Sequence, residues 1–141
     1  MSSELVLDEL TGRNSAGSIA VTAEGGTNTT NLQQGLCKSW WFVTGTGTAA
    51  ITDSLNTSGI VDNGGSGDYT VSFSTNMGNA TYSIGGMCGI ASSTDATSRN
   101  VQPFGGAILA GSLRYNTTSN DANVDQDLDT INYIQIFGDL A

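Results

Sequence analysis

The sequence has no histidine and few basic residues, and these absences exclude several kinds of function. Without histidine the chain lacks the commonest general base and the commonest metal ligand of proteins, so neither a Ser-His-Asp nor a Cys-His catalytic arrangement can form. Four basic residues stand against 13 acidic ones, which gives a formal net charge of −9. Such a chain cannot present the basic surface that nucleic acids require, and an anionic membrane would repel it. We therefore expect neither a nucleic-acid nor a membrane partner.

Cysteines and long apolar runs are also scarce. Cys37 and Cys88 are the only cysteines, and their spacing fits no metal site. The first residues are acidic and no apolar segment follows them, so we expect no secretory signal, and no run reaches transmembrane length. Synthesis in a cytoplasm is therefore expected, with two buried free thiols as the favoured interpretation and a disulfide as the alternative.

Glycine, threonine, serine and asparagine are abundant, which is typical of an all-β protein with tight turns. There are 19 glycines and a single proline. From residue 36 apolar residues recur with a period of two, which indicates strands. The predicted strands are residues 37–43, 49–54, 59–62, 69–74, 81–87, 101–104, 107–116 and 131–137, with turns at 63–65, 77–79 and 105–106. Many short strands with frequent turns favour an antiparallel β-sandwich or a barrel.

The strand at residues 37–43 has apolar side chains on both faces. Trp41 and Val43 lie on one face, and Trp40 and Phe42 lie on the other. Because a strand of an open sheet usually has one wet face, this pattern favours burial by a second sheet on one side and by another subunit on the other. An ordinary sandwich with one central strand explains it equally well. The residues assigned to the core or to a subunit interface are Trp40, Trp41, Phe42 and Phe73.

Residues 1–35 differ from the rest because they contain no aromatic residue. Their apolar residues gather near the start, at Leu5, Val6, Leu7 and Leu10. We expect a short strand at 18–22, a loop at 24–30 and one helical turn at 31–36. A segment of this composition cannot bury enough apolar surface to fold alone. Such an arm is either disordered or packed on a neighbour, and the apolar cluster near its start favours the second. The sequence therefore predicts an anchoring arm at 1–35, which docks on a neighbour, and a knob domain at 36–141.

An ordered set of motifs runs from residue 31 to residue 139. The motifs are Lys38 with Trp40, Gly-Thr-Gly-Thr at 45–48, Ile51 with Asp53 and Ser54, Asp-Asn-Gly at 62–64, Gly-Asp-Tyr-Thr-Val at 67–71, Ser-Leu-Arg at 112–114 and Phe-Gly-Asp at 137–139. This series resembles a module of tailed-bacteriophage fibre and virion proteins. The chain departs from that module at Cys37, Phe42 and Thr52, where the module has Ala, Asn and Arg. The first two changes suit a more buried strand, and the third removes a charge that a subunit contact would use.

The resemblance implies a β-sandwich knob that assembles as a homotrimer on a phage particle, with residues 1–35 as the attachment end. We therefore expect a virion structural protein whose partners are further copies of itself and other virion proteins, either a tail adaptor or fibre or the capsid. The expected role is a short tail fibre or fibre tip that contacts the host surface, through a glycan. The alternative is a capsid decoration or head-fibre protein that recognises nothing.

Ligand binding is expected on two polar loops, at 89–100 and 115–129, because binding residues gather on loops held by a rigid scaffold. The candidates are Ser92, Asp95, Arg99, Asn100, Tyr115, Asn116, Asn120, Asp121 and Asn123. We expect Tyr115 and Tyr133 to show their hydroxyl groups to solvent. The alternative is that both loops are polar surface only.

Metal binding and catalysis receive little support. The acidic segment at 120–129 has the first spacings of a calcium loop, but Gln126 and Asn132 replace its glycine and glutamate, so we expect a solvated loop. Asp53, Asp62 and Asp68 could supply the carboxylate pair of a glycosidase, yet aspartates beside turns are usually turn formers. We expect no enzyme activity, no metal and no cofactor.

Overall fold

The alternating segments form antiparallel strands, and the all-β prediction is confirmed. The computed structural model describes residues 4–12, 19–22, 26–89, 98–121, 124–127 and 130–140. The chain divides into two compact units, Met1–Leu36 and Cys37–Ala141.

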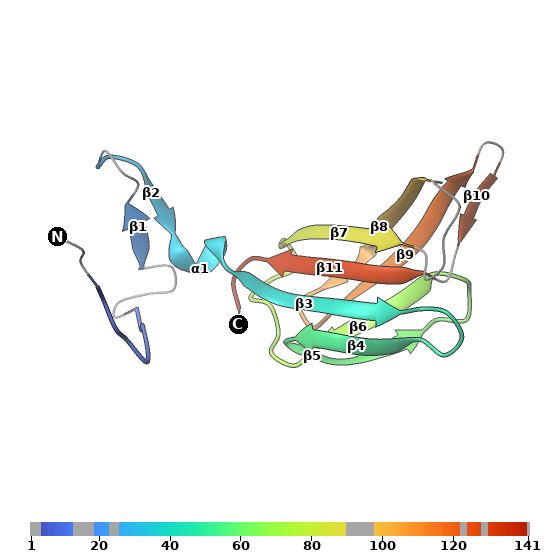
Figure 1. The fold of residues 1–141 in the computed structure, drawn as a ribbon, viewed down its shortest axis with the longest axis horizontal. Coiled ribbons are helices and arrows are strands. Elements are labelled where there is room, and N and C mark those ends of the chain that lie inside the picture. Colours follow the sequence, from blue (N-terminus) through green and yellow to red (C-terminus); the bar gives the residue numbers. More distant parts are fainter. Residues whose placement is uncertain are drawn as a thin grey trace. The chain divides into compact units, whose positions relative to one another are not determined.

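In the Met1–Leu36 unit, β1 (Ala20–Thr22) pairs antiparallel with β2 (Thr29–Asn31), and α1 (Leu32–Gly35) follows directly (Figure 1). Asn31 caps this helix, because its side-chain oxygen accepts hydrogen bonds from the backbone N–H groups of Gln33, at 2.8 Å, and of the next residue. The predicted helical turn at 31–36 is thus confirmed. The segment at 24–30, which the sequence predicts as a loop, ends in β2.

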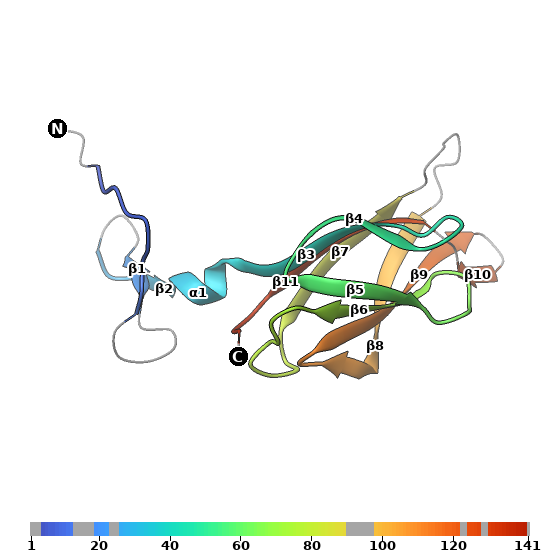
Figure 2. The same cartoon turned by 90° about the horizontal axis from the view of Figure 1, so that it is seen from below.

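The Cys37–Ala141 unit consists of two antiparallel sheets, which form separate layers in Figure 2. The four-stranded sheet has the order β4 (Ala50–Leu55), β3 (Cys37–Thr44), β11 (Ile131–Phe137) and β7 (Ser83–Gly89). The five-stranded sheet has the order β10 (Val124–Asp127), β9 (Ser112–Asp121), β6 (Asp68–Phe73) and β5 (Thr57–Asp62), and β8 (Ser98–Leu109) also pairs with β9. The first and last strands of the unit, β3 and β11, therefore lie side by side in the middle of one sheet.

One hydrophobic core joins the two sheets. Its largest contributors from the four-stranded sheet are Trp41, Val43, Ile134 and Ile136, and those from the five-stranded sheet are Tyr69, Val71, Phe73, Leu113 and Tyr115. Each of these strands contributes every second residue, as the period of a strand requires. The positions between them face away from the core.

Trp41 contacts aromatic residues of the opposite sheet. Its ring centre lies 6.4 Å from that of Phe73 and 6.1 Å from that of Tyr115. Its indole Nε1 donates a hydrogen bond of 3.3 Å to the Tyr115 hydroxyl, so the one polar atom of this buried side chain has a partner. Gly45, just after β3, allows Tyr69 to approach the same strand, because a Cβ at that position would overlap the Tyr69 hydroxyl.

A single residue, Asn56, connects β4 of one sheet to β5 of the other. Its φ of 56° lies in the left-handed region, which asparagine tolerates better than most residues. Its side chain accepts a hydrogen bond of 2.7 Å from the Thr75 N–H and donates one of 3.0 Å to the Thr75 carbonyl. These two bonds hold the corner at which the chain passes from one sheet to the other.

Two predictions for the later strands are wrong. The sequence predicts a turn at 105–106 and one strand at 107–116, whereas β8 continues through both glycines and the turn falls at Ala110 and Gly111. The register of β8 against β9 shifts between Pro103 and Ile108, so the glycines are accommodated in an irregular stretch of a strand. The acidic segment at 120–129 is also not a plain loop, because β10 pairs with β9 there as a hairpin.

Trp40 and Trp41 form a matched pair for testing this core. Trp41 is 1% exposed, whereas its neighbour Trp40 is only half-buried on the opposite face. We expect Trp41→Ala to lower the free energy of unfolding by about 3–5 kcal/mol, because it leaves a cavity and removes the donor to Tyr115. Trp40→Ala should cost about 1 kcal/mol or less. Urea denaturation of both variants checks this, and equal losses would contradict the placement of the core.

Candidate functional site

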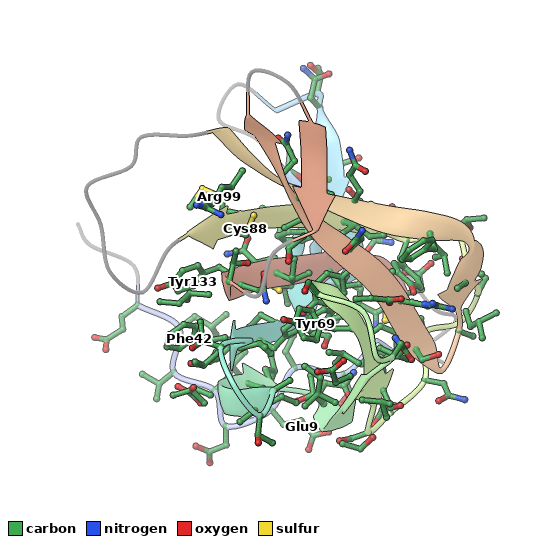
Figure 3. All side chains as sticks on the ribbon, turned by 90° about the vertical axis from the view of Figure 1, so that its right-hand side faces the viewer. Glu9, Phe42, Tyr69, Cys88, Arg99 and Tyr133 are labelled. Carbon is green, nitrogen blue, oxygen red and sulfur yellow. The ribbon has the colours of Figure 1, made fainter. Side chains whose placement is uncertain are left out.

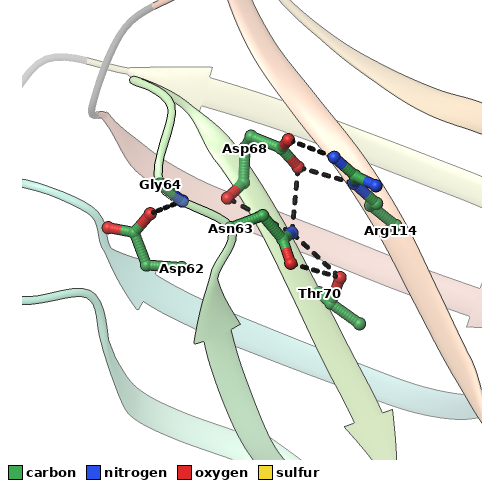
Figure 4. Close-up of polar contacts among 6 residues, drawn as sticks. All are labelled: Asp62, Asn63, Gly64, Asp68, Thr70 and Arg114. Atoms are coloured by element: carbon green, nitrogen blue, oxygen red, sulfur yellow. Dashed lines mark hydrogen bonds and ion pairs between the residues drawn. The ribbon is translucent and has the colours of Figure 1, made fainter.

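The outer face of the five-stranded sheet carries a network of hydrogen-bonded polar side chains (Figure 4). Arg114 of β9 donates to both carboxylate oxygens of Asp68 on β6, at 2.9 Å from Nε to Oδ1 and 2.6 Å from Nη2 to Oδ2. Asn63 donates to Asp68 Oδ1 at 3.0 Å and to Thr70 Oγ1 at 3.0 Å. The Arg114 guanidinium also lies 4.8 Å from the centre of the Phe104 ring. The network pins the turn between β5 and β6 to the neighbouring strand.

This network has the character of a structural pair rather than of a catalytic one. The hydrogen bond from Arg114 is the largest cause that lowers the pKa of Asp68, whereas the general acid of a glycosidase needs a raised pKa. Asp62 accepts a hydrogen bond of 2.9 Å from the Gly64 N–H and so forms the turn. Asp53 lies on β4 in the other sheet. Of the three aspartates considered for glycoside hydrolysis, Asp62 and Asp68 thus flank one turn, and Asp53 lies in the other sheet.

The outer face of the four-stranded sheet is aromatic. The strand register places Phe42 between Asp53 on β4 and Tyr133 on β11, and it places Trp40 opposite Gln135. The Phe42 and Tyr133 rings are stacked, with centres 4.8 Å apart and an angle of 2° between their planes. Figure 3 shows both side chains on the same side of this sheet. We call these five residues the aromatic face.

The aromatic face surrounds a shallow pocket with a volume of about 230 Å³. Trp41 and Ile134 also line the pocket, and because their side chains point into the core, the strand backbone forms its floor. Tyr133 is 48% exposed, while Trp40 and Phe42 are half-buried. The pocket thus combines flat apolar walls with one carboxylate and one amide at its rim, from Asp53 and Gln135.

The four aromatic residues assigned to the core or to a subunit interface separate into two pairs. Trp41 and Phe73 are buried in the core of the single chain. Trp40 and Phe42 point to the opposite side and line the pocket. Alternation along β3 explains this division, since consecutive side chains of a strand face opposite ways.

Tyr115 corrects a prediction. The sequence places its hydroxyl in solvent as a ligand contact, but the side chain is fully buried and accepts the hydrogen bond from Trp41. Burial is the largest cause of its raised pKa. The reason for the error is that β9 extends past this residue, so Tyr115 lies inside a central strand rather than at the start of a loop. Tyr133, by contrast, is exposed as predicted.

The remaining loop candidates give little geometry. Ser92, Asp95 and Asn123 lie outside the described residues, and for Asn120 and Asp121 the structure describes only their place in β9. Asn100 is exposed on β8, Asn116 is half-buried on β9, and Arg99 is half-buried near Cys88 (Figure 3). The calcium-like spacing at 120–129 likewise lies where side chains are not described.

Sequence reasoning missed Asp53 and Gln135 as pocket residues. The alternation of β11 carries part of the signal, because Tyr133 and Gln135 fall on the same face. The pairing of β11 with β3 was not readable, since the two strands lie far apart in the sequence.

The thiols and carboxylates form no further site in the described residues. Cys37 and Cys88 are free, as the sequence favours, but half-buried, and burial raises the pKa of Cys88. No group of three or more cysteine, aspartate or glutamate residues that could hold a metal occurs in the part of the chain that the structure describes. Among those same residues no helix has the length and apolar character needed to span a membrane.

Comparison with known proteins gives no match to a family model, to a curated protein or to a solved structure.

The pair of Asp68 and Arg114 should make stability depend on pH. The pKa of Asp68 lies below its ordinary value of 3.8 in the folded chain, so the pair stabilises the fold above that value and the contribution is lost as pH falls through the folded pKa. We expect Asp68→Asn to be less stable than the parent at pH 7, and the difference to shrink as pH falls below 3.8 and through the folded pKa. Urea denaturation across this range measures it, with Asp53→Asn as the control. A difference that persists at the acid end would contradict this assignment.

Proposed function

We propose that the chain is a virion structural protein of a tailed bacteriophage. The Met1–Leu36 unit attaches it to the particle, and the Cys37–Ala141 unit is a β-sandwich knob that contacts the host surface as a homotrimer. The observation that carries this proposal is the exposure of the apolar residues near the start of the chain. Leu5, Val6, Leu7 and Leu10 are 80%, 79%, 52% and 56% exposed.

These four side chains are not buried within the Met1–Leu36 unit itself. The buried core residues all belong to the Cys37–Ala141 unit, so the first unit has no core of its own among its described residues. A contiguous exposed apolar stretch in such a segment is typical of an interaction site. Each leucine buried on docking would contribute about 1.5–3 kcal/mol, which is enough for a short segment to anchor a small protein.

The contact between Asp68 and Arg114 also supports the resemblance to phage fibre proteins. These residues belong to two separate motifs of that module, Gly-Asp-Tyr-Thr-Val and Ser-Leu-Arg, and they are 46 residues apart in the sequence. In the fold they form a two-bond ion pair. Asp62, of the Asp-Asn-Gly motif, forms the turn beside them. Separated motifs that build one local structure favour a shared module over a chance likeness.

The copy number of the chain in virions tests this proposal. In virions purified from the phage that encodes the chain, quantitative mass spectrometry should find a low copy number relative to the major capsid protein. A copy number comparable to that protein would favour the alternative, a capsid decoration protein. Absence of the chain from virions would refute both functions.

The double variant Leu5→Ser and Leu7→Ser should reduce incorporation into virions more than tenfold, since it removes two buried leucines from the contact. Leu109→Ser is the matched control, because Leu109 is 53% exposed but lies on β8 of the other unit. Both variants should keep the denaturation midpoint of the parent. Equal incorporation of the two variants would show that the first unit is not the anchor.

The oligomeric state is tested separately by light scattering on the purified full chain. We expect a mass of three chains that does not change on dilution through the micromolar range. A monomer under these conditions would refute the homotrimer.

A further inference from the structure

The aromatic face has the chemistry of a carbohydrate site. We propose that its pocket binds a neutral sugar ring of a host glycan, on the sheet rather than on the loops. This inference rests on the proposed function, because it names the site and the class of ligand with which the knob would contact the host.

The apolar part of the pocket suits a pyranose ring. One side of such a ring carries C–H groups that pack on flat aromatic surfaces, and Trp40, Phe42 and Tyr133 offer three of these. The parallel stacking of Phe42 on Tyr133 holds both rings in one orientation before any ligand arrives. A surface that is already ordered loses little conformational entropy when a ligand binds.

The polar part of the pocket suits sugar hydroxyl groups. Asp53 accepts a hydrogen bond of 2.8 Å from the Ser54 N–H through Oδ1, which orients the carboxylate. The second carboxylate oxygen of Asp53 and the side-chain amide of Gln135 make no hydrogen bond within the described part of the chain. A carboxylate accepts from hydroxyl groups, and an amide both accepts and donates. Together they match the mixed donor and acceptor pattern of a sugar.

The size of the pocket sets the size of the ligand. A volume of about 230 Å³ lies below the range of about 300–1,000 Å³ typical of drug-sized ligands, so it would hold a single ring. Gln135 lies opposite Gly85 on β7, and a Cβ at Gly85 would meet nothing within 4 Å. The sheet surface is therefore open beside the pocket, and a glycan chain could continue across it.

Charge selects among the ligands. The Asp53 carboxylate lies at the pocket, and the chain has a net charge of −9. An acidic sugar would be repelled and would leave its own carboxylate facing another, whereas a neutral sugar is not.

Titration of the full chain with single sugars tests the proposal. The probes are the methyl glycosides of glucose, galactose and N-acetylglucosamine, with glucuronic acid as the acidic comparison, and the readout is the amide and indole NMR spectrum. For at least one neutral sugar we expect saturable chemical-shift changes at the Trp40 indole N–H and at the Gln135 side-chain amide, with a millimolar Kd. Glucuronic acid should bind more weakly than the best neutral sugar.

Two phenylalanines provide a matched comparison. Phe42→Ala should weaken the Kd about tenfold, and Phe104→Ala, which removes a 39% exposed ring from the other sheet, should leave it unchanged. Gln135→Ala, which keeps the aromatic walls, should also weaken binding. The absence of saturable shifts with every neutral sugar, shifts located elsewhere, or equal effects of the two phenylalanine variants would overturn the proposal.

The mass of the assembly in solution, measured by light scattering, separates this inference from the proposed function. If Phe42→Ala converts the trimer into monomers, the aromatic face is a subunit contact and the sugar site is overturned while the homotrimer stands. If the parent is a monomer that binds sugar at the aromatic face, the site stands and the homotrimer fails.

Discussion

The indole of Trp41 is the contact on which the two sheets depend. It packs against Phe73 and Tyr115 of the opposite sheet, and its N–H donates a hydrogen bond to the Tyr115 hydroxyl. A buried donor without a partner would cost about 1–3 kcal/mol, so the large apolar ring and its polar atom both require the opposite sheet in this position. Aromatic residues of β3, β6 and β9 thereby fix the spacing of the layers.

The same alternation that buries Trp41 exposes its neighbours. Because consecutive side chains of a strand point to opposite faces, Trp40 and Phe42 must lie on the outer surface once Trp41 faces inward. Part of the aromatic face therefore lies on β3, whose opposite side packs into the core. By contrast, the outer face of the other sheet carries the ion pair of Asp68 and Arg114. The two outer surfaces of one small unit thus offer different chemistry.

Sequence periodicity was sufficient for the all-β class. It grouped Trp40, Trp41 and Phe42 of β3 as core or interface residues without separating the buried Trp41 from the other two, because both faces of that strand are apolar. The periodicity failed at Gly105 and Gly106, because paired glycines usually indicate a turn. Here both lie within β8, which pairs with β9. The periodicity also failed for Tyr115, since the length of β9 depends on partners distant in sequence. The pocket could be predicted only in part. Trp40 and Phe42 were visible as a second apolar face, but Asp53 and Gln135 reach them through a register that no local pattern encodes.

The central position of β3 has a mechanical consequence. The chain enters the Cys37–Ala141 unit at Cys37, the first residue of β3. This strand pairs with β11 between Cys37 and Thr44 and with β4 between Trp40 and Thr44. A pull at Cys37 acts along the strand, across ladder bonds that lie perpendicular to it. Those hydrogen bonds are then loaded together in shear and do not break one after another. A domain tethered in this way resists tension through its whole central sheet.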